Sequence, residues 1–278
     1  MSDAAAGTMR IGFVHTAPAL TPTFEDLLAE YSWSHASDGA ARADGVEAAD
    51  RADRADSADS ADRADAGDTA ETAGSVSHGP AEALHVVDAW LLRTALATGV
   101  DARVHERVRA HVRHLAALGA DAVLITCSSI GETVSSAADE VSIPVLRVDA
   151  AMAEQARDLA SAGVYHRIAA LATFTSTLGP TQRLLEAVAG AGIEVTADVV
   201  AGAADAKAAG DAAGHDAAIL AAAQRVATRA DVIVIAQASM AAAVAGADLT
   251  VPALTSPRGG VQAVLAAARR VHPTLIHS

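Results

Sequence analysis

Two stretches of twelve residues decide how this chain folds: DAVLITCSSIGE at 121–132 and DVIVIAQASMAA at 231–242. Each begins with Asp, continues with five or six residues of a strand pattern and then changes to small polar residues. This order predicts a buried strand of a parallel sheet that turns into a helix. Because the same unit occurs twice, about 110 residues apart, we expect two similar lobes.

Outward from these stretches, short apolar runs alternate with helical patterns along most of the chain. The apolar runs predict strands at 10–15, 122–126, 144–148, 167–173, 194–199 and 232–236. The helical patterns predict helices at 23–34, 80–98, 104–118, 150–162, 178–191, 211–229, 240–245 and 259–271. The helix at 80–98 is expected to end at Gly99 and to carry an apolar stripe of Leu84, Val87, Leu91 and Leu92.

This alternation predicts an α/β fold of two pseudo-symmetric lobes, each a mostly parallel sheet flanked by helices. We expect the first lobe to comprise residues 9–149 together with a C-terminal helix at 257–271, and the second lobe to comprise residues 150–250. Folds of this kind bind ligands at the carboxyl ends of their strands. We therefore expect the active site in the cleft between the lobes.

The stretch at 36–77 differs from the rest, because it repeats Asp every third residue from Asp50 to Asp68. A period of three matches neither a helix face nor a strand face. The stretch holds eleven acidic residues against four Arg, so it carries half of the net charge of −14. It has too few apolar residues to offset the entropy of ordering, which predicts a disordered acidic insertion. Single Asp residues three apart do not converge on one cation.

Deleting residues 38–76 is therefore expected to leave folding and activity unchanged within error, since this stretch has little to bury. Thermal unfolding and an activity assay of the shortened chain check this expectation. A large fall in melting temperature would show that the insertion packs on the lobes.

The composition excludes several classes of protein. The net charge of −14 argues against a broad nucleic-acid-binding face, which needs clustered cations. No apolar run reaches the roughly 18 residues of a membrane span, and the start MSDAAAGTMRIG does not resemble a signal peptide. The single cysteine precludes an internal disulfide and fits a reducing, cytoplasmic location.

The residues expected at the strand ends are small and polar, and none is a carboxylate. Hydroxyls and free backbone N–H groups at helix N-termini form an anion site, because the helix dipole points outward there. The same residue types also occur as plain helix caps. Their convergence along one sheet edge favours a site for a small carboxylate, with these contacts: His15, Thr16, Ser128, Ser129, Thr175, Ser176, Gln237 and Ser239.

Cys127 is the most reactive candidate, since it follows a buried strand and stands at the expected start of a helix. A helix N-terminus favours the thiolate, which makes Cys127 a candidate base or nucleophile. The alternative is a buried structural cysteine.

Metal and cofactor sites have little support in the sequence. His111 and His114 could share a helix face, but no third ligand lies nearby in the sequence, so we expect no metal. The chain has no GxGxxG after a strand, no phosphate loop and no GxSxG turn. We expect no cofactor.

Three segments together resemble the aspartate/glutamate/hydantoin racemase superfamily: VLITCSSIGETV at 123–134, TFTST after the strand at 167–173, and VIVIAQASMAAAV at 232–244. A fourth segment resembles one branch of this superfamily whose reaction is not defined: HVVDAWLLRTALATG at 85–99. The resemblance implies two α/β lobes, a cofactor-independent site between them and a homodimer.

The resemblance also implies a pair of cysteines, one in each lobe, that exchange a proton at the substrate's α-carbon. The first matches Cys127, but the second falls at Gln237. Because an amide neither accepts nor donates a proton near neutral pH, symmetrical two-thiol racemisation is not available to this chain.

Three interpretations remain open. Cys127 could act with another proton carrier, such as His15 or water, in the racemisation or isomerisation of a small acid. The chain could instead act like arylmalonate decarboxylase, a relative with one cysteine whose thiol protonates the carbanion after loss of carbon dioxide. In the third interpretation, the chain is a small-carboxylate binding protein without catalysis, and Cys127 is a packing residue.

Overall fold

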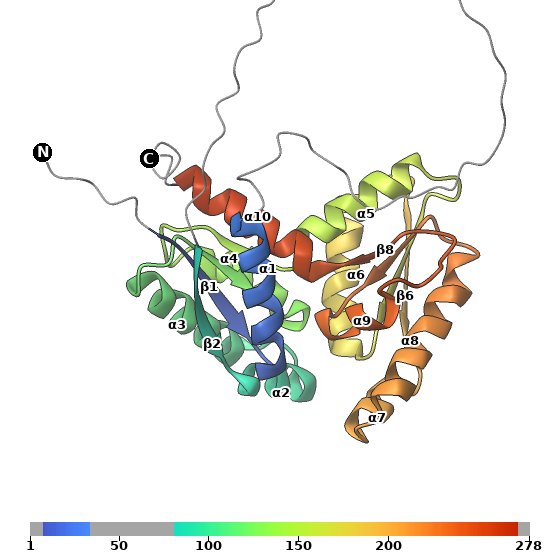
Figure 1. The fold of residues 1–278 in the computed structure, drawn as a ribbon, viewed down its shortest axis with the longest axis horizontal. Coiled ribbons are helices and arrows are strands. Elements are labelled where there is room, and N and C mark those ends of the chain that lie inside the picture. The colour runs from blue at the N-terminus through green and yellow to red at the C-terminus, as the bar shows by residue number, and fades with distance from the viewer. Residues whose placement is uncertain (1–7, 34–80, 272–278) are drawn as a thin grey trace, which may run out of the picture.

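The computed structural model describes residues 8–33 and 81–271, so the acidic stretch at 36–77 lies outside the described residues. The described chain forms two lobes, each with a four-stranded parallel sheet between helices (Figure 1). The expected α/β class with two pseudo-symmetric lobes is confirmed. Within these described ranges, each helix is too short or too polar to form a membrane span.

The two sheets have the same strand order. The first sheet runs β2-β1-β3-β4, with β1 at Met9–His15, β2 at Ala81–Val87, β3 at Ala122–Ile125 and β4 at Val145–Arg147. The second runs β6-β5-β7-β8, with β5 at Arg167–Ala172, β6 at Glu194–Val199, β7 at Val232–Ile235 and β8 at Ala253–Thr255. All neighbouring strands are parallel, so every strand of a sheet ends at the same edge.

Helices cover both faces of each sheet. The helices of the first half of the chain are α1 at Thr21–Trp33, α2 at Ala89–Thr98, α3 at Ala102–Ala117, α4 at Val134–Ala138 and α5 at Ala150–Ala162. Those of the second half are α6 at Thr175–Ala189, α7 at Ala203–Ala208, α8 at Ala212–Ala227, α9 at Ala241–Val244 and α10 at Ser256–Val271. Short 3₁₀ turns, η1 at Pro18–Leu20, η2 at Ser128–Thr133 and η3 at Ala238–Met240, follow β1, β3 and β7.

The lobes exchange one helix each. Helix α5 follows the last strand of the first sheet, yet Met152 and Ala156 pack in the core of the second lobe with Ile168. Helix α10 follows the last strand of the second sheet, yet Val261 and Leu265 pack in the core of the first lobe. Figure 1 shows α10 lying beside α1. We propose that the first lobe comprises residues 9–149 together with α10. The second lobe comprises residues 150–250 and extends to the end of β8.

The sequence repeat is present at the level of single hydrogen bonds. The Asp121 carboxylate accepts the Arg10 backbone N–H at 2.7 Å, and the Asp231 carboxylate accepts that of Arg167 at 2.9 Å. The two registers align Thr16 with Thr173 and Cys127 with Gln237. We call these aligned positions mirror positions.

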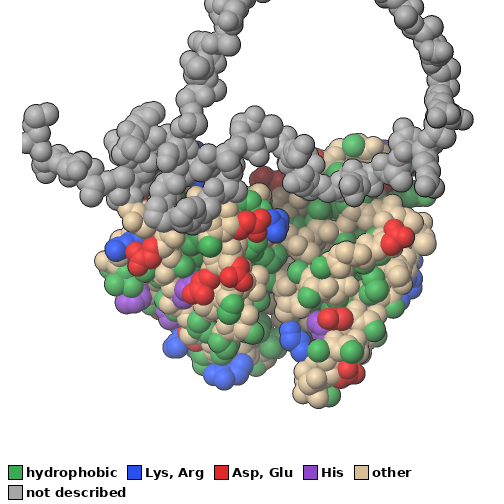
Figure 2. Space-filling model, in the orientation of Figure 1, with side chains coloured by type: hydrophobic (Ala, Val, Ile, Leu, Met, Phe, Trp, Pro, Cys, Tyr) green, Lys and Arg blue, Asp and Glu red, His purple; other side chains and the backbone are tan. Residues whose placement is uncertain are grey.

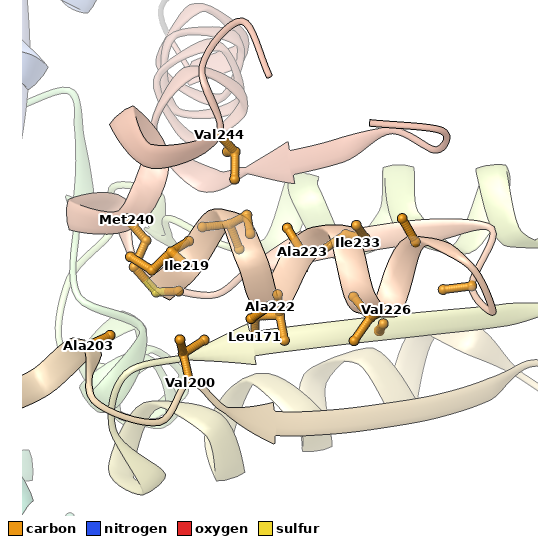
Figure 3. Packing of buried hydrophobic residues seen from close by; sticks show 14 residues of the cluster. Leu171, Val200, Ala203, Ile219, Ala222, Ala223, Val226, Ile233, Met240 and Val244 are labelled. Carbon is orange, nitrogen blue, oxygen red and sulfur yellow. The ribbon is translucent and has the colours of Figure 1, made fainter. Parts of the chain in front are cut away.

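Small side chains let the helices lie close to the sheets. On α8, Ala222 and Ala223 are buried between Ile219 and Val226 and pack against the second sheet, whose Leu171 points into the same cluster (Figure 3). Dense packing of this kind gives a firm core with few aromatic residues.

The helix expected at 80–98 is wrong in its first half, which forms the strand β2. Leu84 and Val86 pack on one face and Ala81 and Ala83 on the other, which is the two-residue period of a strand. Pairing with β1 along its whole length decides this conformation. The helix begins only after Asp88, whose side chain accepts the Trp90 N–H. The short strand β8 is absent from the strands expected from the sequence, because three residues are too few to show the two-residue alternation of a strand.

Candidate functional site

A cavity of about 320 Å³ lies between the two lobes, at the ends of β1, β3, β5 and β7. The space-filling view shows the groove between the two halves of the molecule (Figure 2). The first lobe contributes Thr16, Ala17, Ala19, Leu20, Leu92, Thr126, Cys127, Ser128 and Ser129 to the lining. The second lobe contributes Phe174, Thr177, Lys207, Ala236, Gln237, Ala238 and Ser239.

Cys127 lies at the end of β3, as expected, where the chain turns into η2. Burial raises the pKa of the Cys127 thiol. Hydrogen bonds from the Thr16 side chain and from the backbone N–H groups of Ser129 and Ile130 act against this rise in pKa. The thiol therefore holds its proton near neutral pH, while donors stand ready to stabilise the thiolate once the proton has left.

One hydrogen bond joins the lobes at the cavity. The hydroxyls of Ser129 in η2 and Thr177 in α6 lie 2.8 Å apart, and both residues are buried. Nearby, the Arg183 guanidinium on α6 forms an ion pair with Glu132 of η2. These contacts join η2 of the first lobe to α6 of the second lobe beside the cavity.

Gln237 occupies the mirror position of Cys127, and its orientation is fixed by Thr173. The Gln237 Oε1 atom accepts the Thr173 backbone N–H at 2.6 Å and the Thr173 hydroxyl at 2.7 Å. Since both bonds go to the oxygen, the Nε2 group of Gln237 remains as a hydrogen-bond donor for the cavity.

The chain matches the family model for Asp/Glu/Hydantoin racemase over residues 68–266. The chain belongs to this family. No curated protein sequence matches it. As a member of the racemase family it is expected to share the two-lobed fold, and the similar solved structures bear this out.

Solved structures of three racemase-type proteins have the same fold. The Picrophilus torridus aspartate racemase matches with a TM-score of 0.57 and 12% identity, covering 98% of this chain and 100% of that one. An aspartate racemase homologue from Pyrococcus horikoshii matches with a TM-score of 0.58 and 12% identity, covering 94% and 99%. The allantoin racemase from Pseudomonas fluorescens matches with a TM-score of 0.54 and 15% identity, covering 94% and 92%.

In this racemase-family chain, three of the expected contacts do not line the cavity: His15, Thr175 and Ser176. Thr175 is exposed and Ser176 is only partly so, because successive side chains in the first turn of α6 point in different directions. Phe174 and Thr177 face the cavity from the same TFTST segment.

His15 is fully buried on the side of the first sheet that α1 covers. Its Nδ1 lies 2.9 Å from the Thr126 hydroxyl and its Nε2 lies 2.9 Å from Nδ1 of His85. The two imidazole rings stack on each other and His15 packs against Phe24. Burial, and secondarily the neighbouring His85, lowers the pKa of His15 to about 4. His15 is therefore uncharged near neutral pH and lies behind Thr126 rather than in the cavity.

Several lining residues were not expected from the sequence. Leu20 and Leu92 resemble ordinary core residues, so no local signal marks them, whereas Phe174 lies within the TFTST segment but is not one of its polar residues. Lys207 did have a signal, since it is the only lysine in the chain. Its position on α7 brings it to the cavity.

The histidines of α3 form no metal centre. His105 bonds to the Ser136 hydroxyl and His111 to the Asp88 carboxylate, at 2.8 Å and 2.7 Å. Among the residues that the structure describes, no group of three or more His, Cys, Asp and Glu side chains could hold a metal ion.

Proposed function

We propose that this family member catalyses cofactor-independent proton transfer at the carbon α to a carboxylate of a small acid, as an isomerase or racemase, with Cys127 as the proton carrier. The observation that carries the proposal is the Cys127 thiol in the lining of a cavity between two lobes, with donors from Thr16, Ser129 and Ile130 around it. A proton carrier must lie at the substrate and must have its conjugate base stabilised. Cys127 lies at the cavity, and these donors oppose the rise in pKa that burial causes, which supports its thiolate as the group that takes the α-proton. Water is the second proton carrier: it returns a proton to the α-carbon, and the Cys127 thiol gives its proton back to solvent.

The carboxylate of the substrate is assigned to the second lobe. Gln237 offers its Nε2 group there, and the hydroxyl of Ser239 lines the same wall. Ser128 and Thr16 add hydroxyls from the first lobe. Donors fixed in place before the reaction stabilise the negative charge that moves onto the carboxylate oxygens when the α-carbon becomes a carbanion.

Decarboxylation is the second candidate, and the Cys127–Gln237 mirror pair favours it. In this reaction the bond to a carboxylate breaks, carbon dioxide leaves, and the electron pair remains on the α-carbon. The Cys127 proton then moves to that carbon, and solvent returns a proton to the thiolate. A protonated thiol on one side suffices, and burial raises the pKa of the Cys127 thiol in the direction that keeps it protonated.

Proton NMR in deuterated buffer tests the proposal. Amino acids, hydroxy acids, hydantoins and substituted malonates are incubated with the protein and with Cys127→Ala. Exchange of an α-proton that depends on Cys127 supports the isomerase, with chirality analysis next. Loss of a carboxylate with deuterium at the α-carbon supports the decarboxylase. Binding without either reaction contradicts catalysis and leaves a carboxylate-binding protein.

Gln237→Glu is expected to weaken carboxylate binding by about 100-fold or more, because it places a negative charge where the carboxylate is held. The new side chain keeps an oxygen for the Thr173 donors, so the fold should be retained. Calorimetric titration with a bound acid measures the change. Gln262→Glu, on the exposed face of α10, makes the same charge change away from the cavity and should bind normally. Equal binding by Gln237→Glu would place the carboxylate elsewhere.

A homodimer, which the family resemblance implies, and a cytoplasmic location, which the single cysteine favours, remain part of this proposal. Light scattering coupled to size-exclusion chromatography measures the assembly. A monomer at micromolar concentration would contradict the dimer.

A further inference from the structure

The lining of the cavity, as the described residues form it, holds few charged groups. Among the described residues, Lys207 is the one charged side chain in the lining, and no Asp or Glu takes part in it. Lys207 is exposed on the short helix α7 and forms no ion pair within residues 8–33 and 81–271. Its ammonium group is therefore available to a ligand, and it gives the described lining a positive charge.

Hydrogen-bond donors reinforce this preference for an anion. Thr173 occupies the oxygen of Gln237, so the remaining Nε2 group presents N–H donors to the cavity. Together with the Lys207 ammonium, the second lobe offers one cation and a donor group but no carboxylate. An anion gains charge-assisted hydrogen bonds from this wall.

The rest of the wall is apolar. Leu20 and Leu92 enter from the first lobe and Phe174 from the second, and alanines fill the spaces between them. The methylene groups of Lys207 add to this surface. An apolar substituent placed here leaves water without giving up hydrogen bonds, which favours binding.

A free amino group, unlike an apolar substituent, is disfavoured in this cavity. An α-ammonium group would leave water and meet a lysine of the same charge, with no carboxylate in the described lining to balance it. Moving a cation into such a site is costly because its hydration is not replaced.

We propose that the substrate is a small carboxylic acid that carries an apolar substituent and lacks an α-ammonium group, and that Lys207 is the residue that selects it. The proposal rests on the proposed function only in taking this cavity as the substrate site. It narrows the substrate class, because it sets free amino acids apart from acids of the same carbon skeleton.

Calorimetric titration of the full chain with matched pairs tests the proposal: 4-methylpentanoate against leucine, and 3-phenylpropanoate against phenylalanine. We expect each acid without the amine to bind about tenfold or more tightly than its amino acid. Equal or tighter binding of the amino acids would overturn the proposal. So would the absence of binding by all four compounds.

Variants of Lys207 identify the selecting residue. Lys207→Met keeps much of the apolar stem and should weaken binding of the acids by about tenfold. It should also make this binding less dependent on salt concentration, whereas Lys207→Arg should keep both the affinity and its salt dependence. Arg225→Met, on the exposed face of α8, removes one positive charge from the same lobe outside the cavity lining and is the matched control. Unchanged binding by Lys207→Met would overturn the assignment.

This test separates from that of the proposed function because binding needs no turnover. Selective binding of the acids without Cys127-dependent exchange would contradict the reaction and support the substrate class. Cys127-dependent exchange on free amino acids that bind as well as the acids would support the proposed reaction and contradict the proposed substrate class.

Discussion

Cys127→Ala is expected to abolish turnover while leaving carboxylate binding in place. A positioned acid or base contributes about 10² to 10⁴ in rate, and this chain has no second cysteine to replace it. The contacts assigned to the carboxylate lie on Gln237 and Ser239, which the substitution does not touch. Turnover by NMR and binding by calorimetry measure the two effects separately.

Cys127→Ser is the companion variant, because its hydroxyl fits the same space but hardly exchanges a proton near neutral pH. We expect it to bind like the parent and to be as inactive as Cys127→Ala. Ser136→Ala, on the α4 side of the first lobe, removes a hydroxyl outside the cavity lining and should leave the rate unchanged. Turnover that survives in both cysteine variants would mean that Cys127 is a packing residue.

Acidification from pH 7.5 to 4 is expected to remove about 3 kcal/mol of folding stability through His15 alone. Burial lowers the pKa of His15 from 6.5 to about 4 in the folded protein, whereas the unfolded chain keeps the ordinary value. Between these two values the unfolded chain binds a proton that the folded protein does not. This contribution is therefore complete above pH 6.5 and is lost as the pH falls toward 4. The pKa of His85 is lowered too, again chiefly by burial, so its effect has the same direction.

Denaturant unfolding at a series of pH values measures the slope of the free energy of unfolding against pH. The mirror positions of His15 and His85 in the second lobe are Ala172 and Ala197, so the double variant His15→Ala/His85→Ala copies residues that the fold already accepts. The free energy of unfolding of this double variant should change less with pH between 6.5 and 4, even if the variant is less stable than the parent at pH 7.5. His114→Ala, at an exposed site on α3, should keep the parent slope. A slope unchanged in the double variant would assign the acid sensitivity to other groups.

Much of the fold was predictable because the relevant signals are local. The buried runs of β3 and β7 lie between helical patterns, and each is preceded by an Asp that holds the start of a neighbouring strand. The same runs place Cys127 and Gln237 at strand ends, and parallel strands of one sheet end at one edge. Two of the principal site positions could thus be found from the sequence.

The remaining features depend on which distant segments meet. The two like lobes, and the places of Cys127 and Gln237 at their strand ends, follow from residue periodicity and strand polarity, which are properties of short segments. Contacts between distant segments, in contrast, pair Ala81–Val87 with β1 as a strand and move α5 and α10 to the other lobe. The same contacts turn His15 away from the cavity and bring Lys207 to it. These outcomes follow from packing between segments far apart in the chain, which no local pattern records.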